Sequence, residues 1–311
     1  MASLKEIKSR IASVKNTLKI TSAMKMVASA KLHKAQNAIG NKLPYEQKLH
    51  RMLSGMLQDD DLQNALKKEL GFGNGGRSPV ALQDTAVDAI PVKDEVERVA
   101  VVVFSSNSSL IGAFNANIIK KFGQTMRLLA DAGYSSDDID IYTVGRKVAD
   151  AVRRDGYESY MDLPDLSDKP DYAKASDLAS ELVDRFASGE VGQVILIYNH
   201  FASMSSQPSV RENYLPISLH DYNETSDPVD YILEPDPLTL VRDLLPLVLN
   251  MKIYTVALDA SAAEHAARTV AMQVASDNAT DLITELTLAY NKGRQQAITA
   301  EILDLVGGMQ D

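Results

Sequence analysis

Two short stretches of this 311-residue chain contain residue types that often bind phosphate groups. Gly71, Gly73 and Gly76 satisfy the spacing G-x-G-x-x-G. A dinucleotide site also needs a strand before these glycines and a helix after them, so that the phosphate meets a helix N-terminus. Here an acidic, lysine-containing helix is expected before the glycines, and Arg77-Ser-Pro79 follows them. A cofactor site at these glycines is therefore not favoured.

The second stretch, Ser105 to Gly112, follows an expected strand and precedes an expected helix. It lacks the Lys and the glycine spacing of a P-loop, and G-x-x-x-x-G-K-[ST] occurs nowhere in the chain. A structural turn between strand and helix is the favoured interpretation. The sequence contains no recognisable NTPase site.

Other reactive groups are scarce or scattered. The chain has no Cys, which excludes thiolate chemistry and suits an intracellular protein. No G-x-S-x-G motif supplies a Ser nucleophile, and no His lies in H-E-x-x-H. We therefore predict no catalytic, cofactor-binding or metal-binding residues. The five His residues lie far apart in sequence, at His33, His50, His200, His220 and His265.

Polar side chains within the expected C-terminal helix are the remaining candidates for a functional role. They fit either a solvated helix face or a set of hydrogen-bonding groups for another subunit, with Arg suited to a bidentate contact with a carboxylate. The residues alone leave both interpretations open. These side chains are Asn278, Asn291, Arg294, Gln295, Gln296 and Thr299.

The helix that carries these groups is predicted from its composition. From His265 through Lys292 there is no Pro and no Gly, so one long helix is expected. Its small and apolar residues form a narrow stripe, which indicates a single partner helix of similar length. The predicted stripe consists of Ala271, Ala275, Ala279, Leu282, Leu286 and Ala289.

The N-terminal stretch offers that partner helix. Nine of twelve positions in a three-four alternation are apolar, which is typical of a coiled coil. Thr21 and Lys25 interrupt the seam and either fix its register or face a third body. Pro44 is expected to kink or interrupt the helix. The twelve positions are Leu4, Ile7, Ile11, Val14, Leu18, Thr21, Lys25, Ala28, Leu32, Ala35, Ile39 and Lys42.

Charge also distinguishes the N-terminal segment from the rest of the chain. Residues 1–51 hold eleven Lys or Arg against Glu6 and Glu46, a balance of +9 in a chain whose net charge is −10, so the remainder sums to −19. Such a basic arm suits pairing with the acidic C-terminal segment, and it also suits nucleic acid or a membrane surface. No run of eighteen apolar residues occurs, so we predict no direct membrane span.

Between the termini the pattern changes to that of an α/β sheet. Arg98 to Phe104 is a β-branched run of the kind that is covered on both faces, and strands alternate with helices after it. The predicted fold class is therefore α/β with a long α-helical coiled coil and a central Rossmann-like α/β domain. Strands are expected at 98–104, 140–144, 193–198 and 210–219, with helices at 114–132, 146–155 and 172–188.

Five segments follow from this reading of the chain. They are an N-terminal coiled-coil helix (1–57), a flexible polar insertion (58–97), the Rossmann-like domain (98–220), a connector (221–237) and a C-terminal coiled-coil helix (238–311).

Two separated blocks of sequence resemble the gamma subunit of F-type ATP synthase. Residues 7–28 (IKSRIASVKNTLKITSAMKMVA) and Pro44-Tyr45 are similar to the opening helix of that family. Residues 264–272 (EHAARTVAM), Asn278-Ala279 and residues 290–301 (YNKGRQQAITAE) are similar to its closing helix. The turn Ser106 to Gly112 (SNSSLIG) departs from the family pattern Ser-Asp-x-Gly-Leu-Cys-Gly, and residues 58–97 form a longer insertion than is typical.

The resemblance implies a rotor that is not itself an enzyme. Its terminal helices would form an antiparallel, left-handed coiled-coil shaft inside a ring of three alpha and three beta subunits, with the epsilon subunit and the c-ring at the base. It implies a peripheral position on the cytoplasmic face of a bacterial inner membrane, favoured over the mitochondrial matrix face, and no nucleic acid. The implied contacts with the beta subunits are Met24, Lys25, Arg294, Gln295 and Thr299.

Two alternatives stay open on the residues alone. One is a Rossmann-like ligand-binding protein with coiled-coil arms, which nucleotide binding by the isolated chain would support. The other is a coiled-coil adaptor that binds nucleic acid through its basic arm, with strongly salt-dependent affinity.

Overall fold

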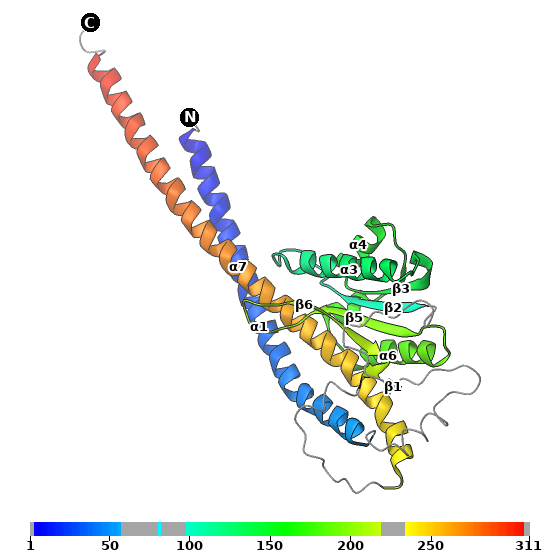
Figure 1. Ribbon diagram of the computed structural model, residues 1–311. Coiled ribbons are helices and arrows are strands. Elements are labelled where there is room, and N and C mark those ends of the chain that lie inside the picture. Colours follow the sequence, from blue (N-terminus) through cyan, green and yellow to red (C-terminus); the bar gives the residue numbers. More distant parts are fainter. Residues whose placement is uncertain (1–2, 57–79, 82–97, 219–233, 308–311) are drawn as a thin grey trace. The chain divides into compact units, whose positions relative to one another are not determined.

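The computed structural model describes residues 3–56, 80–81, 98–218 and 234–307 (Figure 1). The glycine motif at Gly71–Gly76, almost all of the predicted insertion and most of the predicted connector lie outside these residues. Contacts divide the chain into two compact units. Unit 1 comprises Met1–Ala30 with Arg268–Asp311, and unit 2 comprises Lys31–Ala267. The five-segment division of the sequence stays a prediction.

Two long helices contribute residues to both units. Helix α1 spans Leu4–Met56 and helix α7 spans Pro237–Gly307. The helix assignment of α1 runs through Pro44 without the interruption that we considered. Proline removes one backbone hydrogen bond, but the turns that follow it place Leu49 and Leu53 in the main core of unit 2, and this packing offsets the loss.

Apolar composition alone would allow α7 to cross a membrane. Among the described residues it is the only helix that contains a window of eighteen residues apolar enough to span a bilayer. More than half of that window, 56%, is buried inside the protein, as in the core helix of a soluble fold.

Unit 2 contains a five-stranded sheet in the order β4-β3-β2-β5-β6. Strands β2 to β5 are parallel, and β6 runs antiparallel to β5 at the edge. Every position of β2, β3 and β5 is buried, as expected for strands covered on both faces. The strands are β2 (Val99–Phe104), β3 (Ile139–Val144), β4 (Ser159–Asp162), β5 (Gln193–Asn199) and β6 (Ser209–Leu215), and β1 (Val80–Ala81) pairs separately with β7 (Ile217–Ser218).

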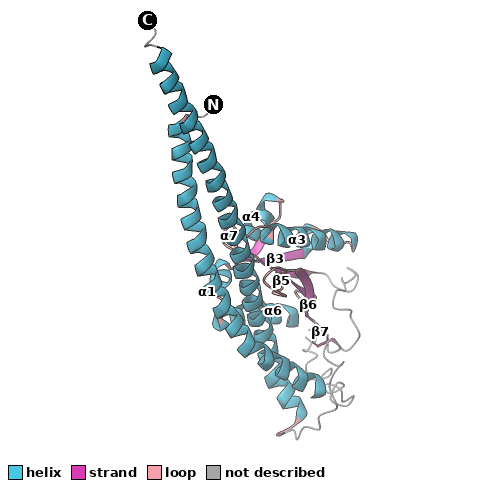
Figure 2. Cartoon of the chain, turned by 90° about the vertical axis from the view of Figure 1, so that its left-hand side faces the viewer, coloured by secondary structure: helices cyan, strands magenta, loops and turns pink. Residues whose placement is uncertain are grey.

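Helices cover both faces of this sheet (Figures 1 and 2). Helices α3 (Phe114–Asp131) and α4 (Arg146–Arg154) lie on one face, and α6 (Tyr172–Ala187) lies on the other with the parts of α1 and α7 that belong to unit 2. Alternate residues of β2 enter the two cores, as the strand period requires. Short helices at Ser136–Asp138 (η1) and Pro164–Asp168 (α5) complete the unit.

The predicted fold class is confirmed: the chain combines a mixed sheet and its helices with long N- and C-terminal helices. The predicted strands and helices of the middle segment all form, with shifted ends, and the edge strand ends at Leu215, before the predicted end at 219. Strand β4 was not predicted, because its sequence SYMD is short and only partly buried. Whether such a segment forms a strand depends on its pairing with β3 and not on the pattern of its own residues.

Ser105 to Gly112 is a structural turn between β2 and α3, as the sequence favoured. Side chains of the turn hold the start of α4: the amide of Val148 donates to Ser105 Oγ at 3.0 Å, and the amide of Arg146 donates to Asn107 Oδ1 at 2.8 Å. Gly145, with φ +109°, lets the two turns approach each other. A Cβ at Gly145 would overlap Ser105 O and lie 2.7 Å from Ser105 Oγ.

Gly145→Ala should therefore lower the free energy of unfolding by about 3 kcal/mol or more, since it adds backbone strain and a clash with a neighbouring main chain. Gly156→Ala is the matched control. Gly156 also has a positive φ, +85°, but nothing lies within 4 Å of its Cβ position, so the cost should be about 1 kcal/mol. Urea unfolding of the two variants measures the difference, and equal costs would contradict this account of the turn.

Candidate partner-binding surface

Unit 1 is an antiparallel pair formed by the first turns of α1 and the last turns of α7 (Figures 1 and 2). Leu4 Cδ2 lies 3.1 Å from the Cβ position of Gly293, and Thr21 Oγ1 lies 2.8 Å from Ser276 Oγ. From Leu4 to Thr21 the chain advances 17 residues along α1, and from Gly293 to Ser276 it returns 17 residues along α7. One axial register therefore relates the two contacts.

The seam on α1 follows the prediction. The predicted positions from Leu4 through Ile39 are buried or half-buried, whereas Lys42 is exposed and the periodic burial resumes at Glu46 and Leu49. Glu46, Leu49, Leu53 and Met56 continue the same three-four frame, and the last three pack in the main core of unit 2, so only Lys42 departs from the pattern.

The seam on α7 follows the predicted stripe only in part. Ala271, Ala275, Ala279 and Leu286 are buried or half-buried, but Leu282 is 42% exposed and Ala289 is exposed, so these two assignments were wrong. The predicted stripe holds only Ala and Leu and so omits Ser276 and Gly293. The buried or half-buried positions, spaced alternately by four and three, are Met272, Ser276, Ala279, Ile283, Leu286, Tyr290 and Gly293.

A hydrogen bond occupies the centre of the seam. Thr21 and Ser276 are each 8% exposed, and their hydroxyls lie 2.8 Å apart. Thr21 Oγ1 also donates to Leu18 O at 3.1 Å. A single buried polar pair stabilises one register against others, because a shift of the helices would break the hydrogen bond between the two hydroxyls. This contact supports the register role that the sequence left open for Thr21.

Large apolar side chains on both helices of unit 1 are exposed to solvent. Exposed apolar surface on both helices of a pair indicates a surface that another protein covers. On α1 these residues are Ile20, Met26 and Val27, and on α7 they are Val270, Val274, Leu282, Leu288, Ile298, Ile302 and Leu303.

The predicted contact residues form two groups on unit 1. Met24 and Lys25 are half-buried on α1, and Arg294, Gln295 and Thr299 are exposed on α7. Thr299 Oγ1 donates to Gln295 O at 2.9 Å.

The structure does not bring the two groups together. By the register of the pair, Met24 lies level with Gln273, which is 21 residues before Arg294 on α7, or about 30 Å along a helix. Helix α1 begins at Leu4, beside Gly293, so the second group lies where α7 continues past the start of α1.

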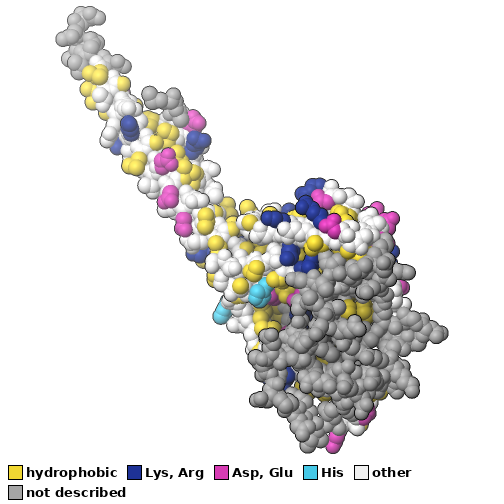
Figure 3. Space-filling model, in the orientation of Figure 1, with side chains coloured by type: hydrophobic (Ala, Val, Ile, Leu, Met, Phe, Trp, Pro, Cys, Tyr) yellow, Lys and Arg dark blue, Asp and Glu magenta, His cyan; other side chains and the backbone are white. Residues whose placement is uncertain are grey.

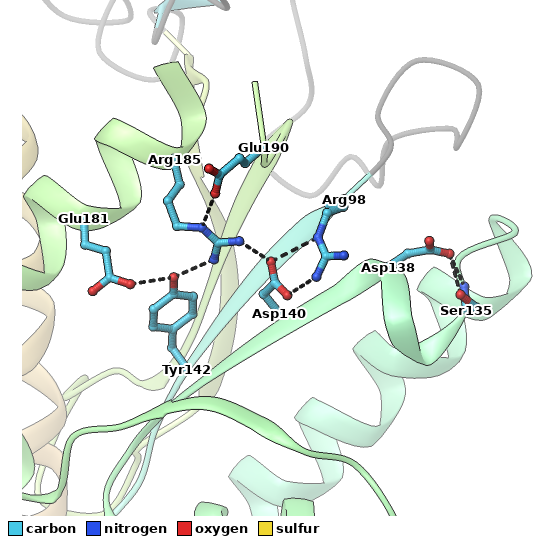
Figure 4. Close-up of polar contacts among 8 residues, drawn as sticks. All are labelled: Arg98, Ser135, Asp138, Asp140, Tyr142, Glu181, Arg185 and Glu190. Atoms are coloured by element: carbon cyan, nitrogen blue, oxygen red, sulfur yellow. Dashed lines mark hydrogen bonds and ion pairs between the residues drawn. The ribbon is translucent and has the colours of Figure 1, made fainter. Parts of the chain in front are cut away.

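In unit 2 an ionic network joins α6 to the sheet (Figure 4). Asp140 accepts from Arg185 Nη2 at 2.8 Å and from Arg98 Nε at 3.3 Å, and Arg185 Nη1 donates to the Tyr142 hydroxyl at 2.8 Å. Arg185 also lies 4.2 Å above the Tyr160 ring. Burial raises the pKa of Tyr142 well above its ordinary value. Every group here has a partner, so the network stabilises the fold.

A second polar cluster is buried beside α1 in unit 2. Glu46 is 3% exposed, and its Oε1 has no hydrogen-bond partner among the described residues. Lys252 Nζ lies 2.8 Å from Glu212 Oε1, and the Tyr198 hydroxyl donates to Glu212 Oε2 at 3.0 Å. Burial raises the pKa of Glu46 against the opposing effect of Lys252, and the nearby Glu212 raises it further.

Metal-binding groups are not gathered in the part of the chain that the structure describes, where no cluster of three or more His, Asp or Glu could hold an ion. His200 instead pairs with Asp259, with 2.7 Å between Nδ1 and Oδ2.

The fold and surface define a class: an α/β protein whose first and last helices pair in one register and expose apolar surface. Comparison with known proteins gives the family. A family model described as ATP synthase matches residues 3–310, and this chain belongs to that family.

Curated relatives cover the whole chain. The ATP synthase gamma chain of Bacteroides thetaiotaomicron is 50% identical over 321 residues, with 99% of both chains covered. That of Flavobacterium johnsoniae is 36% identical, with 100% of this chain and 99% of the relative covered.

Solved structures share the fold. A chain of the Euglena gracilis mitochondrial ATP synthase, in a structure of OSCP, F1 and the c-ring, has a TM-score of 0.61 at 20% identity and covers 99% of this chain and 93% of its own. A chain from the central stalk and c-ring of the Tetrahymena thermophila mitochondrial enzyme has a TM-score of 0.54 at 22% identity and covers 83% of this chain and 99% of its own.

The seam hydrogen bond predicts a coupled pair of substitutions. Thr21→Val or Ser276→Ala alone should cost about 1–3 kcal/mol, because each removes the buried hydrogen bond between the two hydroxyls, and the double variant should cost clearly less than the sum. Thr17→Val on the exposed face of α1 is the control and should change stability by less than about 0.5 kcal/mol. Additive costs in a urea-unfolding cycle would show that the two hydroxyls do not interact.

Burial of Glu46 predicts a dependence of stability on pH. The raised pKa means that the folded chain favours the protonated acid, so the penalty is absent below the ordinary value of 4.5 and grows as the pH rises through the raised value. Glu46→Gln should therefore raise the unfolding temperature, and increasingly so as the pH rises from 4.5 toward the raised pKa of Glu46. The exposed Glu158→Gln is the control. A constant difference across that range would contradict the assignment.

Proposed function

We propose that this chain is the gamma-type rotor subunit in the central stalk of a bacterial F-type ATP synthase. In that role it couples ion flow through the membrane sector to ATP synthesis or hydrolysis at the beta subunits. The family match and the full-length gamma-chain relatives support the assignment. The observation that carries the mechanism is the surface of unit 1, where a helix pair in one register exposes apolar side chains on both of its helices.

Asymmetry is what such a rotor contributes. Three identical catalytic subunits around the pair would each meet a different face of it, and each face would favour a different conformation and hence a different nucleotide affinity. Beyond Gly293 the second helix continues past the start of α1, so the cross-section also changes along the axis. Rotation passes the three states around the ring.

Polar residues at the exposed end of α7 are suited to angle-dependent contacts. Arg294 and Gln295 present charged and amide groups to solvent near the apolar Ile298 and Ile302. An Arg pairs well with carboxylates on a passing loop, and mostly apolar surroundings keep any single angle from binding too tightly. Thr299 would complete this group of contacts, with Met24 and Lys25 forming a separate set level with Gln273.

The remaining assignments follow from the same role. Three alpha and three beta subunits would surround unit 1, and the epsilon subunit and c-ring would meet the base. The subunit would lie peripherally on the cytoplasmic face of the inner membrane. Catalytic sites would belong to the beta subunits, and this chain would not be an enzyme by itself.

A Rossmann-like ligand-binding role has less support. Open α/β sheets bind ligands in the crevice where the strand order reverses, here between the carboxyl ends of β2 and β5. Side chains of the protein itself fill this position: Ile111 and Phe114 from the turn and α3, Phe201 after β5, and Ala263 from α7 form one apolar cluster.

The rotor role predicts the effect of removing the polar contacts. Arg294→Ala combined with Gln295→Ala should reduce ATP-driven rotation or coupled synthesis on the order of fivefold or more, because angle-dependent contacts to the catalytic ring are lost. Both side chains are exposed, so the stability of the chain should change by less than about 0.5 kcal/mol.

Single-molecule rotation and proton-driven ATP synthesis by the reassembled complex measure the first effect, and thermal unfolding measures the second. Asp177→Ala, on the exposed face of α6, is the control and should leave both unchanged. Wild-type rotation and synthesis in the double variant would show that these two residues do not make the proposed contacts.

A further inference from the structure

The outer helical layer of unit 2 carries a charge opposite to that of the whole chain. Helices α3 and α4 together hold seven basic and two acidic side chains, a balance of +5 in a chain of net charge −10. Basic side chains gather over these two helices in the space-filling view, with a few acids among them (Figure 3). The basic residues are Lys120, Lys121, Arg127, Arg146, Lys147, Arg153 and Arg154, and the acidic ones are Asp131 and Asp150.

Most of these cations are not neutralised within the described parts of the chain. Arg153 pairs with Asp162 and Asp150, and Arg154 pairs with Asp155. The other five make no ion pair or side-chain hydrogen bond with the described residues. Like charges on one surface repel each other, and a partner of opposite charge relieves that repulsion. The five are Lys120, Lys121, Arg127, Arg146 and Lys147.

A pocket of about 290 Å³ lies at the carboxyl end of β3, beside α4. Arg146 lines it with a guanidinium that makes no ion pair or hydrogen bond with the described residues, whereas Asp162 is held by Arg153 and accepts from Thr143 Oγ1 at 2.5 Å. Burial would raise the pKa of Asp162, but hydrogen bonds from Thr143 and Ser159 and the charge of Arg153 hold it below its ordinary value. The lining residues are Thr143, Gly145, Arg146, Ala149, Asp150, Arg153, Asp162 and Pro164.

The charges of the pocket favour a single carboxylate. Arg146 and Arg153 balance Asp150 and Asp162, so a ligand with several negative charges, such as a polyphosphate, would meet two fixed carboxylates. Nor does the start of α4 offer free backbone donors. The amide of Arg146 donates to Asn107 Oδ1, and that of Lys147 donates to Ser106 O at 3.1 Å. Recognition here rests on side chains.

We propose that the outer face of α3 and α4 binds an acidic segment of another subunit of the synthase complex. One Asp or Glu of that segment occupies the pocket beside Arg146, and the other basic residues contact its remaining acids. This proposal rests on the proposed function, since it requires the chain to be part of that complex.

A protein segment fits this face better than an anionic lipid surface does. A discrete pocket accommodates one protruding side chain, whereas a membrane surface presents many headgroups and no such side chain. Asp131 and Asp150 would be repelled by anionic lipid, but they suit a protein partner of mixed charge. Leu128, which is 45% exposed on the same helix as Arg127, adds the apolar contact that protein interfaces combine with charge.

The test places a photo-crosslinking amino acid at Gln124, an exposed position of α3 that lies between Lys121 and Arg127 in sequence. The full complex is irradiated in its own membranes, and the crosslinked peptides are sequenced by mass spectrometry. The expected product joins this chain to another subunit of the complex through a peptide rich in Asp and Glu. Crosslinks to lipid alone, to a basic peptide, or to no subunit at all would overturn the proposal.

Charge reversal gives a second measurement. Arg146→Glu should lower the yield of the crosslink by at least about fivefold, and so should Lys120→Glu combined with Arg127→Glu, which does not alter the pocket. Lys169→Glu is the matched control, because it makes the same charge change at an exposed site beyond α5, and it should leave the yield unchanged. Equal yields in all variants would overturn the proposal even if the crosslinked peptide is acidic.

Failure of this proposal is distinguishable from failure of the proposed function. Co-purification with the nucleotide-binding subunits and ATP-driven rotation test the rotor role without any involvement of α3 and α4. An intact, rotating complex without the acidic crosslink overturns only the docking surface. A chain that never joins the complex overturns both.

Discussion

The structure of unit 1 depends on one narrow seam between the first and last helices of the chain. Each helix contributes a single line of residues spaced by three and four, so most of the circumference of the pair stays outside the contact. Burial of apolar area scales with the surface removed from water, and a two-helix seam removes little. Large apolar residues such as Met26 and Leu288 consequently remain exposed on the free chain, at 70% and 66%. In the proposed complex, the surrounding subunits supply the burial that the pair itself does not provide.

The composition of the seam favours a defined register over maximum affinity. Thr21 and Ser276 stand where two apolar side chains would pack as well or better, and Gly293 lets the helices approach without a side chain of its own. Polar pairs within a coiled coil lower its stability and exclude shifted alternatives. A rotor whose helices slid past each other would present a different surface to the ring from one turnover to the next, so register is the property that this role requires.

Sequence reasoning was most accurate where a segment's own pattern decides its structure. The seam of α1 and the strands β2, β3 and β5 follow from strict apolar periodicity or β-branched runs, which hold whatever the partner. The seam of α7 was predicted only in part, because Ser276 and Gly293 become seam residues only opposite Thr21 and Leu4. Strand β4 and the pocket beside Arg146 depend on neighbours far along the chain, and no local pattern marks them.

The two helices of unit 1 differ in length, so the pair that they form is asymmetric. Two helices of one polypeptide differ in sequence and direction, so no rotation by a third of a turn can superimpose the pair on itself. The difference is greatest past the contact of Leu4 with Gly293. There α1 has no further residues beside α7, which continues to Gly307. A threefold ring around such a pair cannot place all three of its catalytic subunits in equivalent surroundings at any angle. In the proposed complex, distinct nucleotide affinities would follow from geometry, because each subunit would adopt the conformation that its own face of the pair stabilises.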